Sequence, residues 1–392
     1  MRIYFSIPLS FSVSFLRAVK RGFLSVAFLV LAESLGSTVA NAASVLPNMA
    51  AARAEAESKG YIFETSHDDI VAKAKKEQGA MQAHISQGPE TIKAVVEAFK
   101  VEYPFVNAQV KEMTGTDESQ RFILQVKAGR AQDFDAGQIS DELFKDYLPY
   151  LKKFDILGMA QKGVLRIPTE IIDPVNRNIV AVNTGMQVIA YNKKLLPVDK
   201  LPSQWEDFLK PEFKGRKFTA DIRPTEIASL VPAWGLEKTL DFARKVAAQQ
   251  PVWVRGATRT LTAMAAGEYA LFMGPNFNTV MRALKKDPTG TLDLKVIEPI
   301  PVRLTEALGI LASSPRPYTA LLWIEFQASP KGQKIVDDYH PYGASAFIAG
   351  SAQEKLSRGK RLSVVGWEHF SKLGEYQEKV FEAYGFPRET GK

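Results

Sequence analysis

The fold class follows from the stretch between residues 81 and 99, which reads MQAHISQGPETIKAVVEAF. Its first five residues form a short run that suits a strand. Residues 86–88, Ser-Gln-Gly, suit a turn, and Pro89 suits the first position of a helix. The apolar residues from Ile92 to Phe99 then recur at helical spacing. We therefore predict a strand, a turn and a helix in that order.

Two further units of the same kind follow at intervals of about 25 residues. We predict strands at 106–110 and 134–138, and helices at 119–127 and 141–150. Strands that alternate with helices favour a parallel sheet. This part of the chain is therefore expected to be an α/β lobe with a largely parallel sheet.

A second group of units begins after two extended segments in 179–191 and a proline-rich passage at 196–207. Strands are predicted at 217–220, 252–254 and 269–273, each followed by a polar turn and a helix. The sequence therefore predicts an α/β protein with two lobes. Each lobe is expected to hold a mixed, largely parallel sheet flanked by helices.

The last strands are predicted at 292–297 and 307–312, and helices are expected from there to the C-terminus. We expect the chain to be divided into a signal peptide, an N-terminal helical arm and two lobes. The signal peptide covers 1–42, the arm 43–65, lobe 1 66–185 plus 303–350, and lobe 2 186–302 plus 351–392.

The signal peptide is predicted from the order of charged, apolar and small residues. Arg17, Lys20 and Arg21 precede an apolar run at 23–32, and Ala40-Asn41-Ala42 follows. This order is typical of a secretory signal peptide that is cut after an A-x-A site. An uncleaved N-terminal anchor is the alternative. We expect export to the periplasm, and no lipid anchor because the chain has no cysteine.

Composition excludes several classes of protein. The chain has 392 residues, 46% of them hydrophobic, and no cysteine, which excludes disulfide scaffolds and thiolate metal sites. The formal net charge is +7, of which +3 comes from residues 1–42, with four basic residues and one acid. The remaining +4 is a weak field without a basic run, so no nucleic-acid partner is expected.

Five turns between a strand and a helix form the candidate ligand site. In open parallel sheets, ligands bind at the carboxyl ends of strands, where helix N-termini offer free N–H groups. The alternative is that these polar residues only cap helices. The candidate residues are Ser86, Gln87, Thr114, Gly115, Thr116, Arg223, Thr225, Arg255, Thr258, Arg259, Asn276, Phe277 and Asn278.

No catalytic motif was found. The chain has no G-x-S-x-G elbow, no phosphate-binding Walker loop and no paired histidines on a helix. We therefore expect no catalytic residue, no cofactor and no bound metal. A secreted enzyme on a similar scaffold, or a ligand-sensing module for a membrane receptor, stays open as an alternative.

Five ordered segments resemble one family. They are VIAYNKKLLP at 188–197, LPSQWEDF at 201–208, PEFKGR at 211–216, AAGEY at 265–269 and SPKGQ at 329–333. Together they resemble solute-binding proteins of ABC importers, nearest to the iron(III)-type group with the type II periplasmic-binding fold. The resemblance covers roughly residues 66–350. It implies two lobes that close on a ligand and deliver it to an ABC permease in the inner membrane; we expect a monomer.

The resemblance does not fix the ligand. Iron-binding members of the group hold Fe(III) with two adjacent tyrosines, and those places here hold Phe277 and Asn278. Neither residue supplies the anionic oxygen that Fe(III) prefers. Arg223, Arg255 and Arg259 instead suit a carboxylate, phosphate or phosphonate, unless they are surface residues or pair with nearby acids. We predict a small anion, or an anion–metal complex, as the ligand.

Overall fold

The computed structural model describes residues 49–113, 115–139, 143–339 and 343–386. The predicted signal peptide lies outside the described residues, and within the expected helical arm residues 49–58 are helical. Residues 53–392 belong to one compact unit, which contains both sheets. No helix in the described part of the chain is long and apolar enough to cross a membrane.

The first sheet contains six strands among the described residues, in the order β11-β10-β3-β1-β2, with β4 paired to β10. β1 runs parallel to β2 and β3, whereas β10 runs antiparallel to β3 and β4 and parallel to β11. The strands are β1 Ala80–Ile85, β2 Asn107–Glu112, β3 Ala136–Ile139, β4 Ile179–Met186, β10 Ile300–Ile310 and β11 Leu362–Val365.

The second sheet contains five strands among the described residues, in the order β7-β6-β8-β5-β9. β7, β6 and β8 are parallel to one another, and β5 is antiparallel to β8 and β9. The strands are β5 Ile189–Asn192, β6 Thr219–Asp221, β7 Val252–Val254, β8 Leu271–Met273 and β9 Leu292–Lys295. Two mixed sheets with parallel βα units confirm the predicted fold class.

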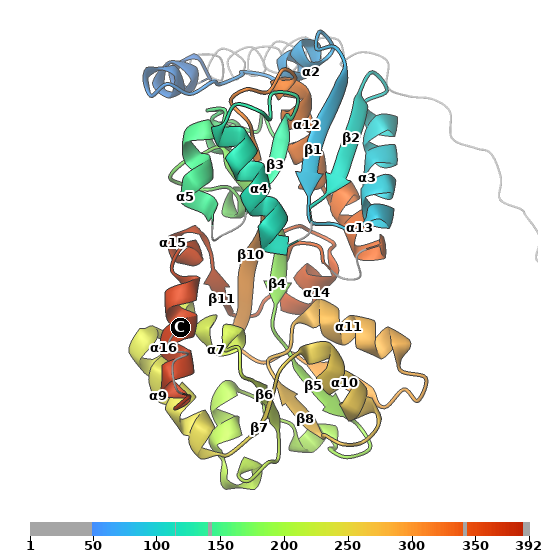
Figure 1. Cartoon of the computed structure of the whole chain (residues 1–392), viewed down its shortest axis with the longest axis vertical. Helices are drawn as coiled ribbons and strands as arrows, with labels where there is room; N and C mark the ends of the chain where they lie inside the picture. Colours follow the sequence, from blue (N-terminus) through green and yellow to red (C-terminus); the bar gives the residue numbers. More distant parts are fainter. Residues whose placement is uncertain (1–48, 114, 140–142, 340–342, 387–392) are drawn as a thin grey trace, which may run out of the picture. The chain divides into compact units, whose positions relative to one another are not determined.

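Helices cover both sheets (Figure 1). Those near the first sheet are α2 His67–Ala74, α3 Pro89–Glu102, α4 Gly115–Lys127, α5 Phe144–Tyr147, α6 Ile156–Gln161, α12 Pro317–Gln327, α13 Pro330–Tyr339, α14 Ala352–Ser357 and α15 Trp367–Phe370. Those near the second are α7 Thr225–Ala228, α8 Val231–Trp234, α9 Leu236–Ala248, α10 Ala257–Ala265, α11 Phe277–Lys286 and α16 Leu373–Ala383.

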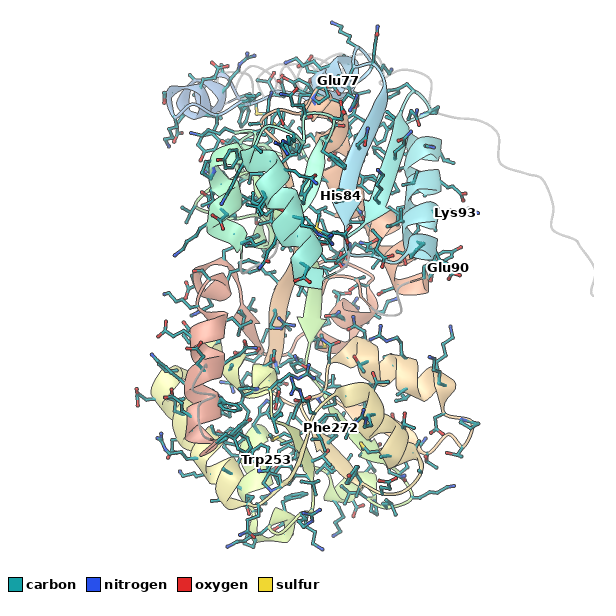
Figure 2. All side chains as sticks on the ribbon, viewed as in Figure 1. Glu77, His84, Glu90, Lys93, Trp253 and Phe272 are labelled. Atoms are coloured by element: carbon teal, nitrogen blue, oxygen red, sulfur yellow. The ribbon has the colours of Figure 1, made fainter. Side chains whose placement is uncertain are left out.

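Each sheet has an aromatic core. Phe99 of α3 packs against Trp323 and Phe326 of α12, with ring centroids 5.2 and 5.4 Å away. Under the second sheet, the fully buried Trp205 packs with Phe208 in a cluster that also includes α9 and α16. In Figure 2, His84 lies on a strand of the first sheet, and Trp253 and Phe272 lie on the second.

Two segments pass from one sheet to the other. β4 ends at Met186 and β5 begins at Ile189, so residues 187–188 make the first passage. β9 ends at Lys295 and β10 begins at Ile300, which makes the second. The lobe boundaries expected from the sequence stay a proposal. In the stretch assigned to lobe 2, β11 pairs with β10 in the first sheet, whereas α16 packs against α9 near the second.

Three expectations about single elements were wrong. β10 begins at Ile300 rather than at 307. Pro301 does not prevent this, because the hydrogen-bonded pairing with β4 begins only at Val302 and needs no N–H group from the proline. The segment Leu362–Val365 was expected to be helical, but its β-branched residues pair with β10 as a strand. The helix expected at 141–150 is split into α5 and a 3-10 turn at Leu148–Tyr150 that contains Pro149.

One buried carboxylate ties the first sheet to the segment before α12. Asp135 is fully buried and accepts hydrogen bonds from the backbone of Gln82 at 2.8 Å and from the Ser314 hydroxyl at 2.7 Å. The Arg316 guanidinium, 12% exposed, pairs with it at 2.9 Å. Removing one partner of a buried ion pair leaves the other charge without compensation.

We expect Asp135→Ala to lower the free energy of unfolding by about 3–5 kcal/mol, because Arg316 would keep its charge without a partner. Asp338→Ala is the matched control, since it breaks the exposed pair with Lys334 and should cost about 1 kcal/mol or less. Urea unfolding of both variants measures the difference. Equal losses in the two variants would contradict the role given to Asp135.

Candidate functional site

The strongest candidate site is a cavity of about 620 Å³ at the carboxyl ends of β6, β7 and β8. The three strands are parallel, so Asp221, Arg255 and Gly274, which end or follow them, meet at one edge of the sheet. This is the place where open parallel sheets bind ligands. The volume suits a small molecule.

Two helices begin at the cavity. α10 follows Gly256, whose φ of +99° favours glycine, and α11 follows Asn276, whose side chain accepts a hydrogen bond from the backbone of Asn278 at 3.1 Å. Ala257, Thr258 and Thr279 of these helices also line the cavity. The first N–H groups of a helix have no partner within the helix, and the helix dipole adds positive charge there.

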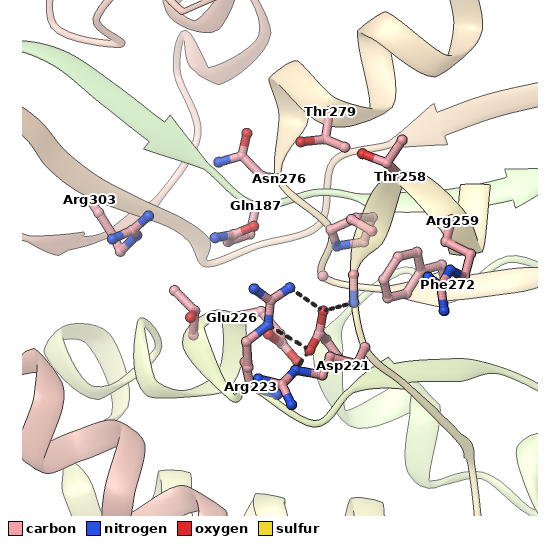
Figure 3. Close-up of a pocket in the computed structure, with 16 residues that line it drawn as sticks. Gln187, Asp221, Arg223, Glu226, Thr258, Arg259, Phe272, Asn276, Thr279 and Arg303 are labelled. Carbon is pink, nitrogen blue, oxygen red and sulfur yellow. Dashed lines mark hydrogen bonds and ion pairs between the residues drawn. The ribbon is translucent and has the colours of Figure 1, made fainter. Parts of the chain in front are cut away.

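Asp221 organises this edge of the sheet. Its carboxylate accepts two hydrogen bonds from the Arg223 guanidinium, at 3.2 and 3.0 Å. It also accepts from the backbone of Arg223 at 2.9 Å and from that of Gly256 at 3.2 Å (Figure 3). Asp221 is only 8% exposed, so the pair is partly buried. Most of the Arg223 charge is therefore compensated within the protein.

Three further arginines line the cavity. Arg255 and Arg259 are exposed, and no ion pair is found for either within the described ranges. Arg303 is half-buried on β10 and lies across the cavity from Arg259 (Figure 3). Arg303 and Asn276 both lie near Gly185, where a Cβ atom would stand 3.2 Å from the Asn276 amide nitrogen and 3.5 Å from the Arg303 guanidinium.

Glu226 is the second carboxyl group of the cavity. It is 3% exposed, and burial raises its pKa well above the usual range. Its Oε1 atom is buried and has no hydrogen-bond partner among the described residues. Gly274 packs directly on this side chain with a φ of +73°, so a Cβ atom at that position would collide with Glu226. Burial thus favours the neutral form of Glu226.

The cavity carries an excess of positive charge. Of the described residues, four arginines and two carboxyl groups line it. When Glu226 is neutral, the described lining holds one negative group, Asp221, and four positive groups, so these residues together carry a formal charge of +3. This charge and the two helix N-termini act on the same space, so the cavity favours an anionic group.

The structure brings together six of the sequence-predicted site residues. The six that line the cavity are Arg223, Thr225, Arg255, Thr258, Arg259 and Asn276. Phe277 does not join them: it is 1% exposed and packs in the core beneath α11. Asn278 is half-buried and does not line the cavity, and its Oδ1 atom is buried without a partner among the described residues.

The candidates from the first sheet lie elsewhere. Ser86 and Gln87 follow β1 and donate hydrogen bonds to Glu306 rather than line this cavity. Gly115 and Thr116 belong to the first turn of α4. Thr114 lies outside the described residues. The first sheet therefore contributes Arg303 of β10 to the cavity.

Five lining residues with a polar side chain are absent from the list of candidate residues: Gln187, Asp221, Glu226, Thr279 and Arg303. Asp221 and Glu226 flank the predicted residues Arg223 and Thr225, so a wider window around that turn would have included them. Gln187 lies in the first passage between the sheets, and Arg303 lies on β10, which follows the second passage. No local sequence signal marks them, because their position depends on the pairing of β4 with β10.

The described lining of the cavity holds no cluster of metal ligands. Among the described residues, neither a tyrosine nor a histidine lines it. The described part of the chain holds no group of three or more histidine, cysteine, aspartate or glutamate side chains that could bind a metal ion.

Comparison with known proteins identifies the family. A family model described as "Bacterial extracellular solute-binding protein" matches residues 132–373. The chain belongs to this family. No curated protein sequence matches the chain. Because these proteins bind solutes, membership confirms the expectation that the chain is not an enzyme.

Solved structures share the fold of this solute-binding protein at low sequence identity. A Bordetella ferric binding protein has a TM-score of 0.62 and 15% identity, over 78% of this chain and 99% of that one. A Trichodesmium protein in complex with iron and citrate has a TM-score of 0.61 and 18% identity, over 79% of this chain and 100% of that one. A substrate binding protein of an ABC transporter from Agrobacterium tumefaciens has a TM-score of 0.54 and 16% identity, over 79% of this chain and 95% of that one.

We expect Glu226→Gln to remove a pH-dependent loss of folding stability that the wild-type protein shows. The unfolded chain releases the Glu226 proton near pH 4.5, whereas burial keeps it bound in the folded state to higher pH. Wild-type stability should therefore fall relative to the variant as pH rises above 4.5, by up to about 1.4 kcal/mol per pH unit. Urea unfolding between pH 4 and 8 measures this, with the exposed Glu97→Gln as control. Parallel pH profiles would contradict a raised pKa.

Proposed function

We propose that this solute-binding protein works in the periplasm, captures a small solute by its anionic group, and delivers it to an ABC permease in the inner membrane. The observation that carries the proposal is the excess of arginine at a cavity where two helices begin. Arginine forks and free helix N–H groups both recognise carboxylate, phosphate and phosphonate. The ligand is either such an anion or an anion bound to a metal.

The transport role draws support from the family and from the fold. The family is extracellular, and the Agrobacterium structure with the same fold belongs to an ABC transporter. Two short passages join the sheets, at 187–188 and 296–299, so the lobes are able to rotate by small changes there while each core stays packed. Gln187 of the first passage lines the cavity, and so does Arg303 on β10 shortly after the second passage, so closure would enclose an anion held by the arginines.

Direct binding of ferric ion is not part of the proposal, although several structures with this fold belong to ferric-binding proteins. The places expected for two phenolates hold Phe277, which is buried in the core, and Asn278. A net positive cavity also repels a bare cation. The Trichodesmium complex with iron and citrate keeps an anion–metal complex open as a ligand class.

Arg255→Ala and Arg259→Ala should each weaken binding of propylphosphonate and inorganic phosphate roughly tenfold or more, because each removes a charge that faces the cavity. Folding should be unchanged, since both side chains are exposed. Arg244→Ala, on the exposed side of α9, is the matched control and should bind like the wild type. Isothermal titration at low salt gives the dissociation constants. A protein that binds neither anion, or binds a neutral solute equally well in all four forms, would overturn the proposal.

Ferric ion added to the purified protein should produce no ferric–phenolate absorption band in the visible range, because no tyrosine lines the cavity among the described residues. Ferric citrate should keep the spectrum of the free complex even if it binds through its citrate. Absorption spectroscopy during the titration checks both. A purple or red charge-transfer band would show a tyrosine-ligated iron site and contradict the anion proposal.

A further inference from the structure

Glu306 has an unusual backbone conformation on β10, the strand of the first sheet that follows the second passage. Its φ of +51° is uncommon for a residue other than glycine. Along one edge of β10, the pairing with β11 ends at Arg303 and the pairing with β3 begins at Ala307. Glu306 lies between these two ladders. The unusual φ therefore falls where β10 exchanges one strand neighbour for another.

The Glu306 carboxylate is held by two neutral donors at the end of β1. The Ser86 hydroxyl donates to it at 2.9 Å and the Gln87 amide nitrogen at 3.2 Å. No cation pairs with Glu306 among the described residues. Gln87 is fully buried, and its Oε1 atom has no hydrogen-bond partner in the described part of the chain. The half-buried Glu306 carboxylate therefore offers a negative charge that suits a group that donates hydrogen bonds.

Glu306 lies close to the arginine-lined cavity. Arg303, three residues earlier on the same strand, lines that cavity, and three extended residues span at most about 10 Å. Glu306 does not itself line the cavity, but a ligand whose charged groups are separated by a short chain is long enough to span this distance. The protein keeps this carboxylate on neutral donors instead of pairing it with the cavity arginines. Separated opposite charges complement a ligand whose own charges are separated.

We propose that the ligand is a small organic zwitterion. Its anionic group, a carboxylate or phosphonate, is held by the arginines and helix N-termini of the cavity. Its cationic group, an ammonium or guanidinium, is held by the Glu306 carboxylate. This inference rests on the proposed function and narrows its ligand class. A ligand without the cationic group is disfavoured, because nothing then offsets the repulsion between its charge and Glu306.

The matched probes are 3-aminopropylphosphonate and propylphosphonate, which differ only in the amino group. Isothermal titration at pH 7 should show that the wild-type protein binds the amino compound at least tenfold more tightly. In Glu306→Gln, which keeps the size of the side chain, this preference should fall to about twofold or less. Glu375→Gln removes an exposed carboxylate on α16 and should keep the full preference.

The outcomes separate the two proposals. If the wild type binds neither phosphonate, the anionic cavity itself is wrong and the zwitterion inference falls with it. If the wild type binds both equally, the anion proposal survives and the zwitterion inference is overturned, whether or not Glu306→Gln folds. A third outcome is that Glu306→Gln binds propylphosphonate more tightly while the wild type shows no preference between the two probes. Glu306 would then only accept the hydrogen bonds of Ser86 and Gln87 and bind no cationic group of the ligand. This outcome also overturns the zwitterion inference.

Discussion

The hydrogen bonds of the Asp221 carboxylate hold the candidate site together. Asp221 ends β6, and it binds both the Arg223 guanidinium and the backbone of Gly256, which follows β7. The carboxylate therefore joins two neighbouring strand ends and fixes the start of α10. Because the carboxylate pairs with Arg223, it does not compete with a ligand for Arg255 and Arg259. The positive cavity depends on this internal pairing.

Strand β10 of the first sheet supplies the charged residue, Arg303, that faces the second sheet's part of the site. It pairs with β4 along most of its length and carries Arg303 toward the cavity and Glu306 toward the end of β1. One strand thus presents charges of opposite sign at two places within reach of a small ligand. Because β10 follows the passage from the second sheet, any rotation of one sheet against the other changes the distance between these two charges and the arginines of the second sheet, Arg255 and Arg259.

The sequence was sufficient to predict the site residues in the turns of the second sheet and insufficient to predict those on β10. Arg255, Thr258 and Asn276 follow parallel strands, and the rule that such strand ends converge placed them correctly near one another. Phe277 was misjudged because a residue at a helix start faces either the cavity or the core, and only packing decides. Arg303 and Glu306 were missed because pairing between distant strands, which no local pattern records, determines where they lie.

A crystal structure of the protein with the solute that it retains from its native periplasm tests the central claim most directly. The account predicts a carboxylate, phosphate or phosphonate oxygen within hydrogen-bond distance of Arg255 or Arg259 and of the first N–H groups of α10 or α11. A neutral solute in that cavity, a metal ion held by protein side chains alone, or a ligand bound away from these arginines would contradict it.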